Sequence, residues 1–97
     1  MNINYKIFIA LNDKDLHKQI VETKEVKKTL SILFDCFTLT ESVGYWKREK
    51  ENTLIVDIIS VECERENIYN KVRFLKQHLN QECILVTETI LNGVKFI

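Results

Sequence analysis

Thr53–Val61, TLIVDIISV, is the stretch on which the fold depends, because it has the β-branched composition of a strand. Alternate residues of a strand point to opposite faces of a sheet. The two rows here are Leu54, Val56 and Ile58 on one face, and Ile55, Asp57, Ile59 and Val61 on the other. Asp57 marks the second row as the less buried one. The first row is therefore predicted to face a layer of helices.

Two helices are predicted on either side of this strand pattern. Residues 64–79 place apolar side chains at helical spacing, and Asn80 is a suitable stop. An earlier helix is predicted to begin at Thr23 as its N-cap residue. The buried stripes are expected to be Val26, Leu30, Leu33 and Phe37 on the first helix, and Ile68, Val72, Leu75 and Leu79 on the second.

Three more segments have strand character: Tyr5–Leu11, residues 37–46 and residues 82–89. Residues 47–52, KREKEN, are predicted to be a charged six-residue loop. Asn92-Gly93 is a two-residue turn signal, which predicts that residues 94–97, VKFI, fold back as a short fifth strand.

The order of elements is strand, helix, strand, strand, helix, strand. Two such units with right-handed crossovers give a four-stranded antiparallel sheet with both helices on one face. The sequence thus predicts an α+β fold, a ferredoxin-like two-layer sandwich in which residues 1–97 form a single domain.

The composition excludes several classes of function. Fourteen basic and fourteen acidic residues cancel, so no overall field attracts nucleic acid or an anionic membrane. The N-terminus has no export-signal pattern and no apolar run is long enough to span a bilayer. Cys36, Cys63 and Cys83 are far apart, so we expect reduced, mostly buried thiols, a cytoplasmic location, and no metal or other cofactor.

The face of the sheet without helices is predicted to carry an apolar surface made by Phe8, Ile55, Ile59 and Val61. Burial of such side chains contributes about 1.5–3 kcal/mol each, against an association cost on the order of 4–15 kcal/mol. The surface alone is marginal for self-association, and we expect a homodimer through this face with added edge-strand pairing or aromatic anchors. The alternative is that the C-terminal VKFI covers part of the face within the same chain. Phe8 also occupies a position at which RNA-recognition motifs stack a base. The third strand carries no second aromatic residue and has Asp57 instead, which argues against RNA binding.

Gly44–Asn52, GYWKREKEN, is the most distinctive stretch. Exposed Trp, Tyr and Arg are frequent anchors of protein interfaces. Tyr45, Trp46, Lys47 and Arg48 are therefore the candidate partner-binding residues. No nucleophile elbow or glycine-rich phosphate loop is present, so no catalytic residue is assigned and the prediction leans against an enzyme.

The segments Gly44-Tyr-Trp46, Glu51-Asn-Thr53 and Asn80-Gln-Glu-Cys-Ile-Leu85, with the first strand YKIFIALND, resemble an uncharacterised bacterial and phage family of small proteins whose function is unknown. The resemblance implies a ferredoxin-like fold and supplies no activity. The leading hypothesis is a small non-enzymatic interaction module, a phage or mobile-element protein that binds or inhibits a host or defence component.

The alternative hypothesis is a dimeric small-molecule-binding protein or enzyme. Its pocket would lie on the open face of the sheet and be lined by Phe8, Tyr45 and Asp57. Glu51 is a second carboxylate that such a cleft can use.

Overall fold

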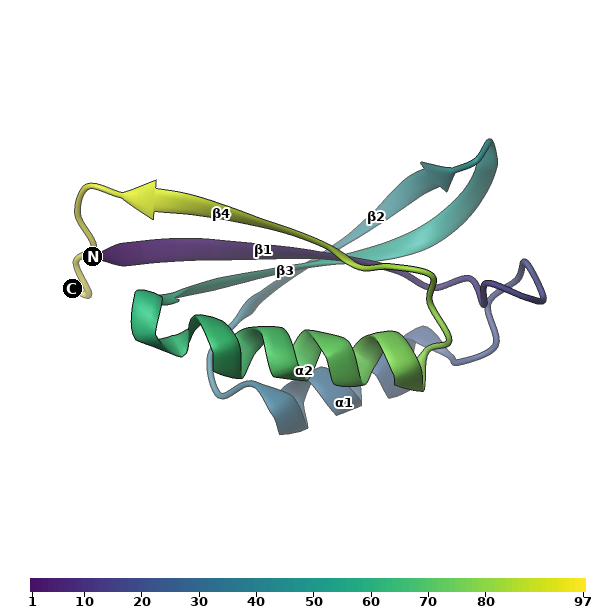
Figure 1. Cartoon of the computed structure of the whole chain (residues 1–97), viewed down its shortest axis with the longest axis horizontal. Helices are drawn as coiled ribbons and strands as arrows, with labels where there is room; N and C mark the ends of the chain where they lie inside the picture. Colours follow the sequence, from purple (N-terminus) through teal and green to yellow (C-terminus); the bar gives the residue numbers. More distant parts are fainter.

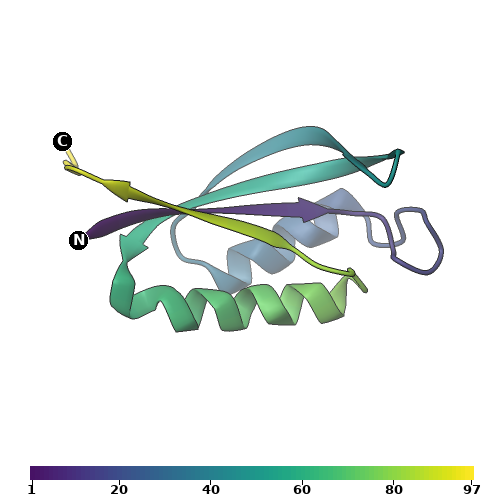
Figure 2. The ribbon, with the colours of Figure 1, turned by 45° about the horizontal axis from the view of Figure 1, so that its top comes forward.

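The computed structural model describes all 97 residues, Met1–Ile97. Its elements are β1 (Asn2–Ala10), α1 (Thr23–Leu33), β2 (Thr38–Trp46), β3 (Glu49–Val61), the short 3-10 turn η1 (Glu62–Glu64), α2 (Arg65–His78) and β4 (Leu85–Leu91). The strands form one antiparallel sheet in the order β2-β3-β1-β4. Both helices cover the same face of that sheet (Figures 1 and 2). The predicted ferredoxin-like sandwich is confirmed.

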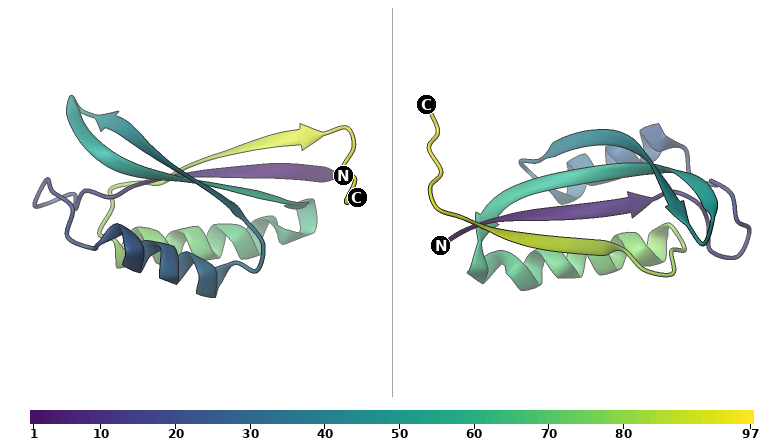
Figure 3. Two further views of the ribbon diagram at one scale, coloured as in Figure 1. Left: turned by 180° about the vertical axis from the view of Figure 1, so that it is seen from behind. Right: turned by 90° about the horizontal axis from the view of Figure 1, so that it is seen from above.

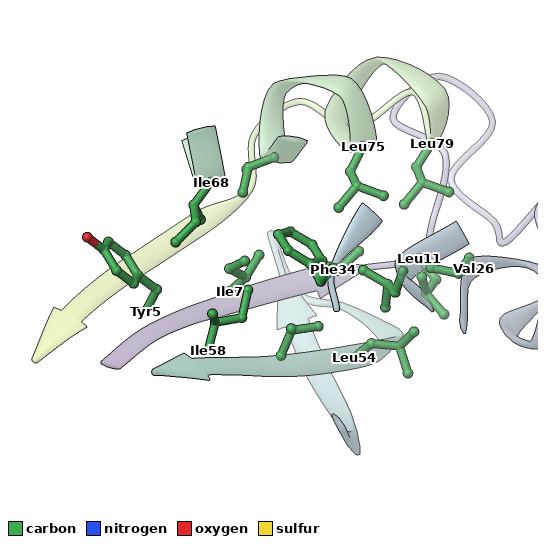
Figure 4. Packing of buried hydrophobic residues seen from close by; sticks show 14 of the residues in the cluster. Tyr5, Ile7, Leu11, Val26, Phe34, Leu54, Ile58, Ile68, Leu75 and Leu79 are labelled. Atoms are coloured by element: carbon green, nitrogen blue, oxygen red, sulfur yellow. The ribbon is translucent and has the colours of Figure 1, made fainter. Parts of the chain in front are cut away.

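The core lies between the sheet and the two helices, as Figure 4 shows. The predicted rows of β3 are correct, because the row with Leu54, Val56 and Ile58 is buried against the helices. The stripe of the second helix is also confirmed. The buried apolar residues of α2 are Ile68, Val72 and Leu75, and Leu79 follows just beyond the helix. Those of β1 are Ile3, Tyr5, Ile7 and Ile9.

The first helix differs from the prediction at both ends. Its N-cap residue is Glu22, not Thr23, and no side chain caps it. The Thr23 hydroxyl instead accepts a hydrogen bond from Gln19 Nε2 (3.0 Å). The helix ends at Leu33, so Phe34 is the residue that enters the core while Phe37 is only partly buried.

The prediction of a six-residue loop at 47–52 is wrong. β2 and β3 continue to the register pair Trp46↔Glu49 and are joined by a two-residue turn at Lys47 and Arg48. Both turn residues have positive φ angles, 48° and 69°, which is the backbone of a type I′ hairpin turn. The long hairpin bends away from the helices at this end (Figure 1).

Two further expectations are wrong. Residues 94–97 form no strand, because Gly93 does not adopt the positive φ angle that a tight hairpin turn requires. The three cysteines are exposed rather than buried, since each lies in a connection: Cys36 after α1, Cys63 in η1 and Cys83 before β4. No helix is long and apolar enough to cross a membrane.

A polar cluster ties α2 to the edge strand β4. The Arg65 guanidinium donates to both oxygens of Glu88, with Nη2 2.7 Å from Oε1, and the Tyr69 hydroxyl donates to the same carboxylate. These hydrogen bonds, first that from Arg65 and then that from Tyr69, lower the pKa of Glu88 below its usual value of 4.5.

The two chain termini lie together at one end of the sheet. The β2–β3 turn and the connection from β1 to α1 lie at the other end (Figure 1).

Candidate binding hollow on the open face of the sheet

The right-hand view of Figure 3 looks onto the open face of the sheet, with the helices behind it. The strand register places the four residues predicted to form an oligomer surface on this face. Phe8 is the register partner of Ile55 on one side and of Leu85 on the other. Ile59 and Val61 lie further along β3. The structure thus brings all four onto one face, and the homodimer itself stays a prediction.

A polar row divides this face into two parts. Lys6 and Asp57 are register partners, and they lie between the pair Phe8↔Ile55 and Ile59. Lys6 Nζ is 3.8 Å from the Asp57 carboxylate. Asn4 Nδ2 donates to the same carboxylate (3.0 Å). Asp57 thus interacts with its neighbours and does not line the hollow at the Phe8 end of this face. The prediction that Asp57 lines a pocket together with Phe8 and Tyr45 is wrong, because Asp57 lies too far along β3 from the hairpin end.

A hollow of about 340 Å³ lies at the Phe8 end of the open face. Its walls come from the end of the β2–β3 hairpin, the connection after β1 and the segment before β4. Its lining residues are Phe8, Ala10, Asn12, Asp13, Lys14, His17, Gly44, Tyr45, Trp46, Lys47, Glu49, Glu51, Thr53, Gln81, Glu82, Cys83 and Leu85.

Small side chains create the space beside the aromatic ones. Ala10 of β1, Thr53 of β3 and Gly44 of β2 lie on the same face as Phe8. A Cβ atom at Gly44 would lie 2.7 Å from Thr53 Oγ1, which is too close for an ordinary contact. A larger residue at this position would therefore require the Thr53 side chain or the two strands to shift.

The two edges of the sheet come together over the hollow. In a flat sheet, four strands spaced ~4.8 Å apart would separate β2 from β4 by roughly 14 Å. Here the Trp46 indole N–H at the end of β2 donates to Glu82 Oε2 (3.3 Å), three residues before β4. Lys47 Nζ also lies 3.4 Å from that carboxylate. The sheet is thus curled enough for side chains from opposite edges to meet.

Glu51 is the most buried acidic residue in the hollow, with 7% of its surface exposed. Its Oε2 accepts a hydrogen bond from the backbone N–H of Asn12 (3.1 Å), which fixes the carboxylate against the connection after β1. Its Oε1 makes no hydrogen bond within the chain. A hydroxyl, ammonium or other donor in the hollow can therefore bind this oxygen.

The connection after β1 is held in place by Asp13. Asp13 Oδ1 accepts from the backbone N–H groups of Asp15 and Leu16, and Oδ2 accepts from Asn80 Nδ2 (3.0 Å). The bond from Leu16 contributes most to a lowered pKa of Asp13, followed by the bond from Asn80. His17 Nδ1 lies 3.3 Å from the Glu49 carboxylate and links this connection to the hairpin.

The lining combines aromatic rings with an excess of negative charge. Phe8, Tyr45 and Trp46 supply the rings, while four carboxylates (Asp13, Glu49, Glu51 and Glu82) outnumber two lysines. Aromatic faces and carboxylates both attract cations. The hollow is therefore suited to a small molecule that has a flat apolar part and a positive charge.

The sequence identified part of this site. Phe8 and Tyr45, predicted to line a pocket on the open face, do line it, as does Glu51. Trp46 and Lys47, predicted as partner-binding residues, lie at its rim beside the exposed turn residue Arg48, and their partner-binding role stays a prediction. Glu82 was missed because only the curl of the sheet brings it near Trp46.

No family model matches the chain, and no curated protein matches it. Two solved structures share its fold. A phage SAM lyase in complex with S-methyl-5′-thioadenosine is 21% identical with a TM-score of 0.63, covering 91% of this chain and 80% of the lyase chain. A phage SAM lyase in the apo state is 24% identical with a TM-score of 0.55, covering 90% of this chain and 78% of the lyase chain.

These neighbours contradict the prediction of a non-enzymatic interaction module, because both are enzymes that degrade S-adenosylmethionine (SAM). The prediction failed for a physical reason. The sequence predicts Tyr45 and Trp46 as protein-binding anchors at a strand end, whereas in the structure both residues line a concave site.

Proposed function

We propose that the hollow binds SAM and that the chain cleaves it. The likeness to phage SAM lyases extends over most of both chains and supports a shared architecture. One of those lyases is in complex with S-methyl-5′-thioadenosine, the part of SAM that remains when its amino-acid chain is removed from sulfur.

The observation that carries the proposal is the pairing of aromatic rings with the buried Glu51 carboxylate in one cavity. SAM combines a flat adenine, a ribose with two hydroxyl groups and a positively charged sulfonium. Rings such as Phe8 and Trp46 can pack against adenine and attract the sulfonium. The unoccupied Glu51 Oε1 can accept a hydrogen bond from a ribose hydroxyl. A cavity of 340 Å³ lies within the usual range for small-molecule sites, roughly 300–1,000 Å³.

Cleavage that leaves S-methyl-5′-thioadenosine breaks the bond between sulfur and the amino-acid chain. The electron pair of that bond stays on sulfur, so the sulfonium becomes a neutral thioether. No water is added in a lyase reaction, so the carbon that leaves sulfur has two outcomes. It bonds to the carboxylate oxygen of the same amino-acid chain and closes a lactone, or the neighbouring carbon gives a proton to a carboxylate of the hollow and an alkene forms. The carboxylates of the hollow attract the charged substrate more strongly than the neutral product. We therefore expect SAM to bind more tightly than S-methyl-5′-thioadenosine, and the difference to shrink as salt is added.

The three exposed cysteines allow a direct test of where ligand binds. Cys83 lines the hollow, whereas Cys36 and Cys63 are exposed elsewhere and serve as internal controls. Alkylation with N-ethylmaleimide is followed for each cysteine by mass spectrometry, with and without S-methyl-5′-thioadenosine. Bound ligand should slow the reaction of Cys83 alone. Equal rates at all three cysteines with saturating ligand would refute binding in the hollow.

Activity is tested by incubating the purified protein with SAM and measuring the release of S-methyl-5′-thioadenosine by chromatography. Glu51→Gln keeps the size of the side chain but removes its charge, so turnover should fall. Glu41→Gln, an exposed change on β2 outside the hollow, is the matched control and should leave turnover unchanged. Absence of release by the folded wild-type protein at any SAM concentration would refute the lyase assignment.

The remaining predictions fit this proposal. A cytoplasmic location would give the protein access to SAM, which cells make and use in that compartment. A phage or mobile-element origin agrees with the source of the two structural neighbours. A homodimer through Phe8, Ile55, Ile59 and Val61 would enclose the open face further.

A further inference from the structure

A second cavity, of about 490 Å³, adjoins the hollow. We call it the basic groove. It is lined only by polar residues: Lys14, Arg73, Lys76, Gln77, Asn80 and Gln81. Lys14 and Gln81 line both cavities, so the two share a wall. The hollow has an excess of carboxylates, whereas no carboxylate lines the groove. Adjoining cavities of opposite charge suit a ligand with a charge of each sign.

The cations of the groove are largely free to bind an anion. Lys14 and Lys76 have no carboxylate within 4.0 Å. Arg73 lies 3.6 Å from Glu66, and both of these side chains are more than half exposed. Lys76 stands in the last turn of α2, where it complements the helix dipole. The dipole explains neither Arg73, which is further from the helix end, nor Lys14, which is on another segment.

The two acidic residues that flank Lys14 in the sequence, Asp13 and Asp15, already accept hydrogen bonds from Asn80. Asn80 Nδ2 donates to Asp13 Oδ2 (3.0 Å) and to Asp15 Oδ2 (2.9 Å). The backbone N–H of Lys14 itself donates to the Asn80 carbonyl (3.0 Å). These bonds fix the start of the Lys14 side chain at the end of α2 and leave its ammonium group without a partner.

We propose that the basic groove binds the carboxylate of the ligand that occupies the hollow. The inference rests on the proposed function. The amino-acid end of SAM carries a carboxylate only a few bonds from sulfur, and Lys14 borders both cavities. The adenosyl sulfonium occupies the acidic, aromatic hollow, while the carboxylate points toward Lys14 and Lys76. Lys14 is the specificity-determining residue, because it selects ligands that retain the amino-acid end.

The test uses two ligands that are not cleaved at a sulfonium: S-adenosylhomocysteine and its carboxamide, in which a neutral amide replaces the carboxylate. Affinities are measured by calorimetry at fixed ionic strength for the wild type and for Lys14→Met, Lys76→Met and Lys28→Met. Lys28 is exposed on α1 and lines neither cavity, so it provides the control. The wild type should bind the carboxylate form about three- to tenfold more tightly than the carboxamide.

That ratio should fall to about one in Lys14→Met, decrease in Lys76→Met and persist in Lys28→Met. A ratio that Lys14→Met leaves unchanged would overturn the assignment. Inorganic phosphate provides a second arm. Suppose that phosphate binds to the wild type and not to Lys14→Met, and that the wild type binds the two adenosyl compounds equally well. The groove then binds an independent anion, and the inference is wrong. If neither adenosyl compound binds while the wild type still releases S-methyl-5′-thioadenosine from SAM, the carboxylate assignment is wrong. If SAM is not cleaved either, the proposed function itself fails.

Discussion

Replacement of Gly44 by alanine tests whether a close contact between β2 and β3 shapes the hollow. The added Cβ atom would lie 2.7 Å from Thr53 Oγ1, so the strands or the Thr53 side chain must move. Overpacking of this kind costs about 1–3 kcal/mol. Alanine recovers about 0.5–1 kcal/mol relative to glycine in a strand, through the entropy of the unfolded chain. The net loss should be about 0–2.5 kcal/mol in the free energy of unfolding.

Urea denaturation of four proteins separates the clash from the other effects: wild type, Gly44→Ala, Thr53→Ala and the double variant. Thr53→Ala removes the oxygen that the new Cβ would meet, so alanine at position 44 should then be tolerated. The double variant should be more stable than the sum of the two single changes predicts, by a coupling free energy of about 1–3 kcal/mol. A coupling below about 0.5 kcal/mol, with Gly44→Ala as stable as the wild type, would refute the reasoning.

Three further changes test other features. Arg48→Gly should stabilise the protein by about 0.5–1 kcal/mol and raise Tm by a few degrees, because arginine at φ 69° is strained. Arg48→Ala should not stabilise the protein, because alanine is strained in the same way. Thermal unfolding of the two variants compares these outcomes. Glu88→Gln should destabilise the protein at neutral pH. Because bonding to Arg65 and Tyr69 lowers the folded-state pKa of Glu88, this stabilisation is present above its usual pKa of 4.5 and is lost as the pH falls through the lower folded value. The stabilities of variant and wild type, measured by urea denaturation from pH 7 to pH 3, should therefore converge in acid, and a constant difference would contradict this account. Ile59→Glu places a charge on the open face; if that face forms a homodimer, sizing chromatography should show the variant as a monomer and the wild type as a larger species.

The fold could be predicted because strand alternation and helical spacing are local patterns of the sequence. The alternation in β3 identified its buried row correctly because Asp57 distinguishes one face from the other. The stripe of α2 was equally clear, since four apolar residues recur at helical spacing and Asn80, at φ 48°, ends the segment. Such patterns report which face of an element is buried.

The hairpin and the hollow depend on features that the local sequence does not encode. Lys47 and Arg48 adopt left-handed conformations without the Gly or Asn that usually indicates a type I′ turn, so a loop was predicted. The hollow requires the hairpin end and the segment before β4 to approach each other across the curled sheet. The contact between Trp46 and Glu82 joins residues 36 positions apart. No spacing in the sequence predicts it.

Both chain termini lie at the end of the sheet remote from the hollow (Figure 1). An affinity tag, a fluorescent fusion or a linker to a sensor surface can thus be attached at either end without obstructing ligand access. Immobilised protein would present the candidate site toward the solution. Tandem copies joined through these ends would keep both sites accessible, which makes the chain convenient for ligand screening.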